Sequence, residues 1–212
     1  MDTLPFADRR HAGRVLAERL RDQAGRPGLL VLALPRGGVP IGFEVAHALG
    51  APLDVLVVRK LGLPWHPELA MGAIAGGVGV LHPLAGTVPA ADVERIARQE
   101  TAELQRREQL YRGGRPAPQW TGRSVIVVDD GLATGATMQA AAQAVRSQHP
   151  AWLCLAVPVG DAGSCRRMAP FADAVVCAET PEDFSGVGQW YRDFSQTSDE
   201  EVQALLQAAA LA

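Results

Sequence analysis

The stretch Val125-Ile-Val-Val-Asp-Asp-Gly-Leu-Ala-Thr-Gly-Ala-Thr137 decides both the fold and its candidate site. Its first four residues are apolar β-formers, which predict a strand covered on both faces, as in a parallel sheet. Asp129 and Asp130 follow at once, so they lie at the carboxyl end of that strand, where open α/β sheets bind ligands. Two adjacent, partly desolvated acids repel each other and need partners, and the vicinal hydroxyls of a ribose can donate to them.

A run of small residues follows the two acids and predicts an anion-binding loop. Its backbone amides can wrap an anion, the Thr134 and Thr137 hydroxyls add donors, and the following helix offers its positive N-terminus. A capped strand-to-helix turn would explain the glycines and threonines but neither acid. The residues expected to bind a sugar phosphate are Asp129, Asp130, Gly131, Ala133, Thr134, Gly135, Ala136 and Thr137.

Two other common nucleotide-binding loops are excluded. No Lys follows Gly135, and the P-loop pattern G-x-x-x-x-G-K-[ST] occurs nowhere in the chain. Gly76-Gly77-Val78-Gly79 lacks the strand, the helix and the downstream acid of a dinucleotide fingerprint. The turn is therefore interpreted as a sugar-phosphate site.

Outward from this turn, helices and strands alternate along the chain. Amphipathic spacing predicts helices, and continuous apolar runs predict buried strands. The expected helices cover residues 8–23, 40–49, 90–112, 137–148 and 161–169, with a last one capped by Ser198, and the expected strands cover 29–34, 53–58, 124–128, 152–157 and 174–177. We therefore expect a single domain over residues 1–212, an α/β fold with a doubly wound, mostly parallel five-stranded sheet.

Two segments interrupt this alternation. Residues 62–88 contain Met71–Ile74 and Val78–Leu81 around Gly76-Gly77, which predicts a hairpin outside the sheet and a small hood or lid. Residues 180–197 have no regular periodicity, so a second irregular loop is expected there.

Composition is that of an ordinary globular protein, with 48% apolar and 20% charged residues. A formal net charge of −3 gives no case for binding nucleic acid or a lipid surface. The first residues lack the apolar core of a signal peptide and no apolar run is long enough to span a membrane, so we expect a cytoplasmic protein. Cys154 and Cys177 lie in apolar runs and are expected to be buried free thiols, which fits a reducing cytoplasm.

The sequence VIVVDDGLATGATM at 125–138 resembles the phosphoribosyl-pyrophosphate motif of type I phosphoribosyltransferases, and is especially similar to that of the adenine enzymes. The resemblance implies that Asp129 and Asp130 hold the ribose 2′ and 3′ hydroxyls and that Ala133 through Thr137 hold the 5′-phosphate. A bacterial group described only as predicted phosphoribosyltransferases resembles the chain more widely. The matching pieces are DRRHAG at 8–13, LPRGGVPIG at 34–42, VRKLG at 58–62, PELAMGAIAGG at 67–77 and WYRDFSQTSDEEV at 190–202.

Three basic segments are candidates for holding pyrophosphate. Pro35-Arg36-Gly37-Gly38 follows a buried strand and opens a helix, and its glycines let the backbone approach an anion. It corresponds to the family's pyrophosphate loop, which is often built around a cis peptide. Arg59 and Lys60 end the neighbouring predicted strand and face opposite ways, so we expect one of them to enter the site.

The third segment is Trp190-Tyr-Arg-Asp-Phe194. It resembles the aromatic-Arg-Asp segment of hypoxanthine-guanine enzymes, where the Arg reaches pyrophosphate and nearby aromatics help to hold the base. By that resemblance, Arg192 is a pyrophosphate ligand, Trp190 and Tyr191 lie beside the acceptor, and 180–197 is the acceptor-side loop. A rival interpretation is that the aromatic residues pack the last helix onto the domain.

The lid region carries the remaining candidates. In the family, residues 62–88 correspond to a mobile catalytic loop that closes over the reaction. Trp65, His66, Glu68 and His82 could handle a proton there, and we select only Glu68, as an acceptor-side residue.

The leading hypothesis is an enzyme that transfers the phosphoribosyl group to a nitrogen acceptor. Asp129, Asp130, Arg36 and Lys60 are its expected catalytic residues. Mg²⁺ is the expected cofactor, near Asp129 and Asp130 directly or through other ligands, with Asp193 as a further candidate. A homodimer is the family expectation, and the base is not identified.

Two other functional classes remain open. A protein that senses phosphoribosyl pyrophosphate without catalysis could use the same fold. A phosphatase or kinase that uses the two acids needs an early aspartyl nucleophile or a nucleotide loop, and the sequence has neither.

Overall fold

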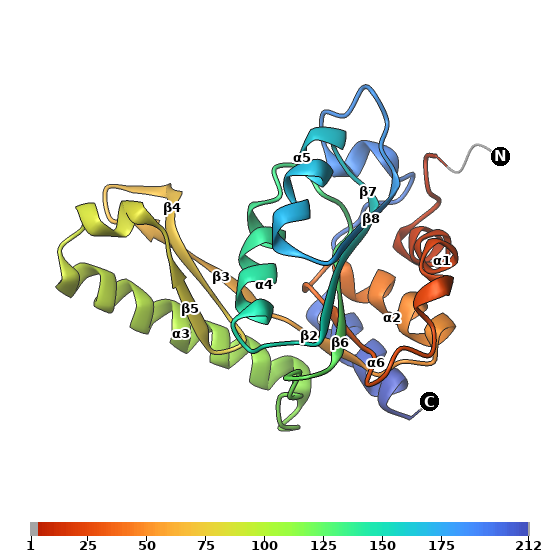
Figure 1. Cartoon of the computed structure of the whole chain (residues 1–212), viewed down its shortest axis with the longest axis horizontal. Coiled ribbons are helices and arrows are strands. Elements are labelled where there is room, and N and C mark those ends of the chain that lie inside the picture. Colours follow the sequence, from red (N-terminus) through yellow and green to blue (C-terminus); the bar gives the residue numbers. More distant parts are fainter. Residues whose placement is uncertain (1–3, 212) are drawn as a thin grey trace.

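The computed structural model describes residues 4–211, and at its centre is a five-stranded parallel sheet (Figure 1). Every neighbouring pair of strands in it is parallel. In spatial order the strands are β2 (Leu53–Val55), β1 (Leu30–Ala33), β6 (Ser124–Val128), β7 (Trp152–Val159) and β8 (Ala174–Glu179). The predicted α/β class with a mostly parallel five-stranded sheet is confirmed.

Helices cover both faces of this sheet, as expected for a doubly wound fold (Figure 1). Alternate residues of β1 go to opposite sides: Val31 packs with one group of helices and Leu32 with the other. Each strand therefore needs apolar residues at every position, which is the pattern seen in the sequence. The first group is α1 (Arg9–Arg19), α2 (Gly38–Leu49) and α6 (Asp199–Ala210), and the second is α4 (Ala136–Arg146) and α5 (Ala162–Arg167).

A second, antiparallel sheet and the long helix α3 (Ala90–Arg112) extend away from the first sheet (Figure 1). Its strands, in order, are β3 (Val58–Leu63), β4 (His66–Ala75) and β5 (Val78–Leu81). β4 and β5 form the predicted hairpin, with Gly76 and Gly77 at its turn. α3 packs against this sheet, and so does α4, which joins it to the main domain.

One predicted strand was wrong in its extent. The apolar run at residues 53–58 predicts one strand, but β2 ends at Val55, and Arg59 and Lys60 belong to β3 of the second sheet. Leu56 and Val57 are buried in the two separate cores that flank the junction between the sheets. Burial at a junction gives the same apolar pattern as a strand, so periodicity could not separate the two.

A buried ion pair anchors α3 to the main sheet. Arg112 is 5% exposed, and its guanidinium donates to both carboxylate oxygens of Asp54, at 3.1 and 3.2 Å, and to the Val55 carbonyl, at 2.9 Å. Burial raises the pKa of Asp54, and the Arg112 charge opposes this shift only in part. This ion pair therefore holds α3 beside β2, and removal of either partner would leave the other charge without its main counter-charge.

We expect Arg112→Ala to lower the free energy of unfolding by about 3–5 kcal/mol, since the substitution removes the guanidinium that compensates the Asp54 charge. Urea unfolding at neutral pH measures this loss. The loss in unfolding free energy should be smaller in acid. The pKa of Asp54 is raised in the folded protein, so Asp54 becomes protonated there as the pH falls, and the neutral carboxyl group no longer needs the arginine.

Arg98→Ala is the control, because Arg98 pairs with Glu94 on the exposed side of α3. For this variant we expect the free energy of unfolding to change by less than about 1 kcal/mol. Equal losses for the two variants would contradict the prediction.

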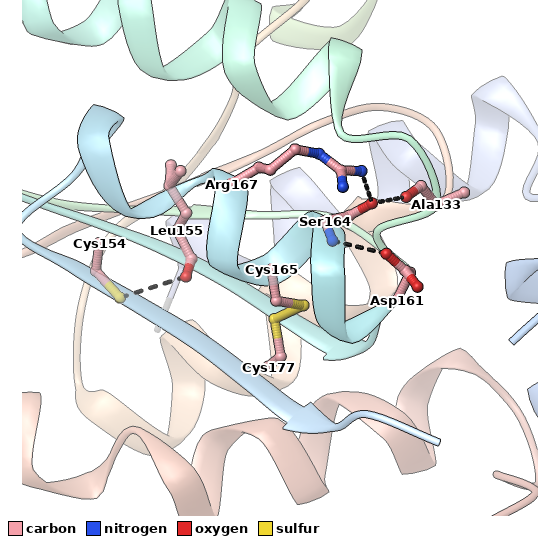
Figure 2. Close-up of a disulfide and its surroundings, with 8 residues drawn as sticks. All are labelled: Ala133, Cys154, Leu155, Asp161, Ser164, Cys165, Arg167 and Cys177. Carbon is pink, nitrogen blue, oxygen red and sulfur yellow. Dashed lines mark hydrogen bonds between the residues drawn. A yellow bond between two sulfur atoms is a disulfide. The ribbon is translucent and has the colours of Figure 1, made fainter. Parts of the chain in front are cut away.

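The cysteines differ from the prediction. Cys154 is the expected free, buried thiol, and burial raises its pKa to about 12. Cys177 is not a free thiol: it forms a disulfide with Cys165, which joins β8 to α5 (Figure 2). The packing of α5 beside β8 brings the two Cα atoms to 6.6 Å, which their separation of 12 residues does not reveal. The argument from free thiols to a reducing compartment is therefore wrong for Cys177.

Within residues 4–211, none of the helices combines the length and the apolar character needed to cross a bilayer.

Candidate active site

The two acids lie at the point where the strand order of the main sheet changes direction. From β1 the chain goes outward to β2, and from β6 it goes the other way to β7. The carboxyl ends of β1 and β6 are neighbours, because Ala33 and Val128 are paired and the Leu34 N–H donates to the Val128 carbonyl at 2.9 Å. A switch point of this kind opens a crevice between two loops. Here those loops are 35–38, after β1, and 129–135, after β6.

Asp129 and Asp130 are half-buried, and their charges are only partly compensated. The Asp129 carboxylate accepts a hydrogen bond from the Asp130 N–H at 2.8 Å. Burial raises the pKa of Asp129 well above its usual range, and the neighbouring Asp130 charge raises it further. Burial also raises the pKa of Asp130, although the nearby Arg9 guanidinium acts against it. Perturbed pKa values of this kind are typical of acids in a functional site rather than of ordinary surface charges.

The loop after the acids is exposed on one side and braced on the other. Ala133, Thr134, Ala136 and Thr137 are exposed, whereas Gly135, at φ 84°, forms the N-cap of α4. Its outer surface can therefore meet an anion at the positive end of α4.

α5 and the strand before it brace the same loop from beneath. The Ser164 hydroxyl donates to the Ala133 carbonyl (Figure 2). The Asp161 N–H donates to the Leu132 carbonyl at 2.9 Å, and Leu132 pairs with Gly160. These contacts fix the conformation of the loop, so the loop would lose little conformational entropy if it bound a ligand.

The loop at 35–38 packs directly against the two acids. The Pro35–Arg36 peptide bond is cis, as the resemblance to a pyrophosphate loop leads us to expect. A Cβ atom on Gly37 would overlap Asp130 Oδ2 and lie 2.8 Å from its Cγ, and one on Gly38 would lie 2.8 Å from the Val128 carbonyl oxygen. The two glycines are therefore required by contact with the neighbouring turn, in addition to any anion they bind.

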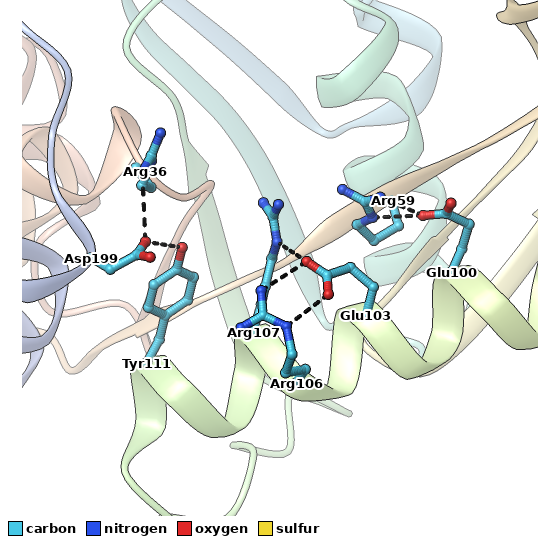
Figure 3. A network of polar contacts seen from close by, with 8 residues as sticks. All are labelled: Arg36, Arg59, Glu100, Glu103, Arg106, Arg107, Tyr111 and Asp199. Carbon is cyan, nitrogen blue, oxygen red and sulfur yellow. Dashed lines mark hydrogen bonds and ion pairs between the residues drawn. The ribbon is translucent and has the colours of Figure 1, made fainter.

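Arg36 and Arg59 lie at opposite ends of a row of polar contacts along α3 (Figure 3). Arg36 Nη1 is 3.8 Å from Asp199 Oδ1, at the first turn of α6, and the Tyr111 hydroxyl donates to the same oxygen at 2.8 Å. Arg59 donates to Glu100 Oε2 from Nε at 2.7 Å. Each arginine is thus held by a carboxylate at the edge of the site.

Lys60 follows Arg59 in β3, where strand alternation predicts that only one of the two side chains enters the site, but both residues line one cavity. A cavity of about 300 Å³ between the second sheet and α4 is lined by Lys60 and Arg59, and also by His82 and Thr137. The structure therefore brings the basic pair of β3 to the same cavity as Thr137 of the anion loop. It also places His82 there, which the sequence did not favour.

The C-terminal segment packs behind the acids. Tyr191 is buried, its ring lies 5.4 Å from Phe6 and 5.0 Å from Phe194, and its hydroxyl donates to the Asp130 carbonyl. Trp190 packs against the same cluster. For Tyr191, the geometry favours the packing interpretation over stacking on an acceptor, because the residue is buried beside Phe6 and Phe194.

Arg192 and Asp193 do not join the two acids in a common cluster. Arg192 is exposed, and its backbone N–H donates to the Phe6 carbonyl. The exposed Asp193 carboxylate accepts a hydrogen bond from the backbone N–H of Ser195 at 2.9 Å. Over the described part of the chain, no group of three or more His, Cys, Asp or Glu side chains could hold a metal. Asp193 is therefore not placed with Asp129 and Asp130 as a metal ligand.

Glu68 lies in β4, but its side chain is outside the described part of the structure, so its acceptor-side role stays a prediction. Trp65 and His66, beside it, are exposed.

Arg9 is a site residue that the sequence patterns did not predict. It begins α1, and its Nε and Nη2 atoms each lie 3.0 Å from Asp130 Oδ2. One signal was present: a basic residue in the first turn opposes the helix dipole, which points to a specific partner elsewhere. The partner is 121 residues away in the sequence and could not be identified from it.

A family model described as "Phosphoribosyl transferase domain" matches residues 9–194. The chain is 52% identical over 208 residues to "Putative phosphoribosyl transferase Rv0571c" of Mycobacterium tuberculosis (strain ATCC 25618 / H37Rv). This match covers 96% of the present chain but 47% of the relative, so the chain spans about half the length of that protein. A second M. tuberculosis strain has a relative with the same values.

Solved structures agree in fold. The protein TT1426 from Thermus thermophilus superposes with a TM-score of 0.86 at 43% identity, over 96% of this chain and 98% of that one. A hypoxanthine-guanine phosphoribosyltransferase from Bacillus anthracis has a TM-score of 0.50 at 12% identity, over 87% of this chain and 88% of that one, a likeness of fold alone.

Proposed function

Because this chain belongs to the phosphoribosyl transferase family, we propose that it transfers the 5-phosphoribosyl group of phosphoribosyl pyrophosphate to a nitrogen acceptor, a nucleobase, and releases pyrophosphate. One observation carries the proposal: a pair of half-buried acids lies at the switch point of the sheet, with the loop at 35–38 packed against it and the N-terminus of α4 beside it. This arrangement suits a ligand with a sugar in the middle and phosphate groups at both ends.

The ribose and its 5′-phosphate would occupy the turn after β6. Asp129 and Asp130 would accept hydrogen bonds from the 2′ and 3′ hydroxyls. The amides of Ala133 through Thr137, with the Thr134 and Thr137 hydroxyls and the N-terminus of α4, would hold the 5′-phosphate. Because hydrogen bonds from Ser164 and Asp161 brace this loop, its contacts with the phosphate would orient C1 of the sugar toward the opposite loop.

The pyrophosphate would lie against the loop after β1. Charge builds on its oxygens as the bond to C1 breaks, so cations and amides that strengthen at that moment accelerate the step. The amides of Gly37 and Gly38 can supply donors, and Arg36, Arg59 and Lys60 can supply charge. Arg36 and Arg59 pair with partly exposed acids, and such surface pairs contribute about 0–1 kcal/mol, so a multiply charged ligand can displace them.

The donor set at the turn fits Mg²⁺ that arrives with its substrate. This ion keeps several waters and takes few protein carboxylates beside substrate phosphates. Asp129 and Asp130 are two adjacent carboxylates, and one oxygen of Asp130 is already bound by Arg9. They would hold Mg²⁺ directly or through water, and the bound ion would neutralise developing charge on pyrophosphate.

The acceptor would enter from the side of the second sheet and the C-terminal segment. Glu68 remains our candidate for a proton acceptor there, and Trp190 for contact with the base. We further propose that the protein acts as a homodimer in the cytoplasm.

The test is an assay of the purified chain with phosphoribosyl pyrophosphate, Mg²⁺ and a panel of purines and pyrimidines. We expect calorimetry to detect binding of phosphoribosyl pyrophosphate, and we expect pyrophosphate to form with at least one base. Tight binding without pyrophosphate release from any base would favour a sensing protein instead. Release of phosphate in place of pyrophosphate would contradict phosphoribosyl transfer.

A further inference from the structure

Arg9 connects the candidate ribose-binding acid to the C-terminal segment. Its Nε and Nη2 atoms bind Asp130, and its Nη1 atom donates to the Ser195 carbonyl at 2.6 Å. Its guanidinium carbon also lies 4.0 Å from the centroid of the Phe194 ring. We propose that Arg9 is a positioning residue for ribose recognition, which holds the Asp130 carboxylate in one orientation. The proposal rests on the function proposed above.

The geometry of the pair leaves part of the acid for a ligand. Both Arg9 contacts go to Oδ2 of Asp130, so Oδ1 is outside the contacts that Arg9 makes. The planar guanidinium fixes the direction of that carboxylate more tightly than a single ammonium donor would. The side chains are 10% and 19% exposed, so water screens their attraction only weakly.

The carboxylate is confined from other directions as well. The Gly37 backbone lies so close that a Cβ there would overlap Asp130 Oδ2, and it would be 3.1 Å from Arg9 Nε. The Tyr191 hydroxyl donates to the Asp130 carbonyl and fixes the backbone of the same residue. Asp130 therefore has little freedom in which to meet a sugar hydroxyl, and Arg9 sets its side-chain direction.

The next residue in the helix shows what a purely structural arginine does here. Arg10 donates to Glu44 of α2 at 2.7 Å and stays half-exposed. It joins α1 to α2 as a surface ion pair. Arg9, in contrast, joins α1 to the acids and to the segment expected beside the acceptor.

The experiment measures recognition of the sugar hydroxyls by calorimetry, with ribose 5-phosphate and its 2-deoxy and 3-deoxy analogues as ligands. We expect the unaltered protein to prefer ribose 5-phosphate over at least one deoxy analogue by roughly tenfold, the effect of one hydrogen bond to a charged group. Arg9→Ala should lose most of that preference, whereas its affinity for the deoxy analogue should change by less than about threefold. Arg9→Lys should recover part of the preference, because it keeps the charge but not the two-donor geometry.

Arg10→Ala is the matched control and should keep the full preference, and thermal unfolding checks that each variant is folded. If Arg9→Ala does not fold, Arg9→Lys carries the test. A folded Arg9 variant with the full preference for the hydroxyl would overturn the inference alone. An unaltered protein that binds no sugar phosphate would overturn the proposed function and the inference with it.

Discussion

Replacing Asp129 and Asp130 together with asparagine should abolish pyrophosphate release with every acceptor. The amides keep the size of the side chains but remove the charge that strengthens hydrogen bonds from the ribose hydroxyls. Loss of both acids should lower kcat/KM by at least about a hundredfold, since each hydrogen bond to a charged group contributes about 1.5–3 kcal/mol. A continuous assay of pyrophosphate formation measures the effect, and undiminished turnover would refute the assignment of the two acids.

The same variant should not lose stability, which separates this loss of function from unfolding. Burial raises the pKa values of Asp129 and Asp130 in the folded state, so the folded protein binds these protons more tightly than the unfolded chain. The stabilisation linked to such groups is present at low pH and is lost as pH rises through the raised folded-state values. At neutral pH the two charges therefore oppose folding, and the asparagine variant should melt at the same or a higher temperature.

The pH profile of melting, recorded with EDTA, tests this sign. The difference between the variant and the unaltered protein should disappear in acid, below the usual aspartate pKa of about 3.9, where both carry neutral side chains. A variant that melts at a lower temperature at neutral pH would mean that the acids act as structural partners.

Replacing Gly37 with alanine should remove binding of phosphoribosyl pyrophosphate. The new Cβ would overlap Asp130 Oδ2 and approach Arg9 Nε to 3.1 Å, so the loop, the carboxylate or the ion pair must move. We expect affinity to fall at least about a hundredfold, and the free energy of unfolding to fall by about 1–3 kcal/mol, as for other overpacked sites. Calorimetry and urea unfolding measure the two quantities.

Gly86→Ala is the control for this substitution. A Cβ on Gly86 meets no heavy atom within 4 Å, and its φ is not in the left-handed region. Its affinity should be unchanged and its stability should change by no more than about 0.5 kcal/mol. If Gly37→Ala binds as the unaltered protein does, close contact between the two loops is not needed for the site.

Much of the fold could be predicted because its signals are local. The Ser124–Val128 run is a strand with the predicted bounds, and Asp129 and Asp130 lie at its end, because both features depend on neighbours in the chain. The helix predicted at residues 90–112 is α3 with the same bounds, because its polar and apolar residues alternate with a helical period. Patterns of this kind need no knowledge of the chain path.

The tertiary structure alone decided which distant residues meet. Arg9 reaches Asp130, Cys165 pairs with Cys177, and Tyr191 turns its ring into the core. It also decided that Arg59 belongs to the second sheet, since a buried junction and a buried strand have the same apolar residues. The sequence by itself determined the turn that carries the two acids and the alternation of helices and strands, because the spacing of apolar residues that marks a helix or a strand involves only residues close in the chain. The partners of those acids depended on the path of the whole chain, which no local pattern contains.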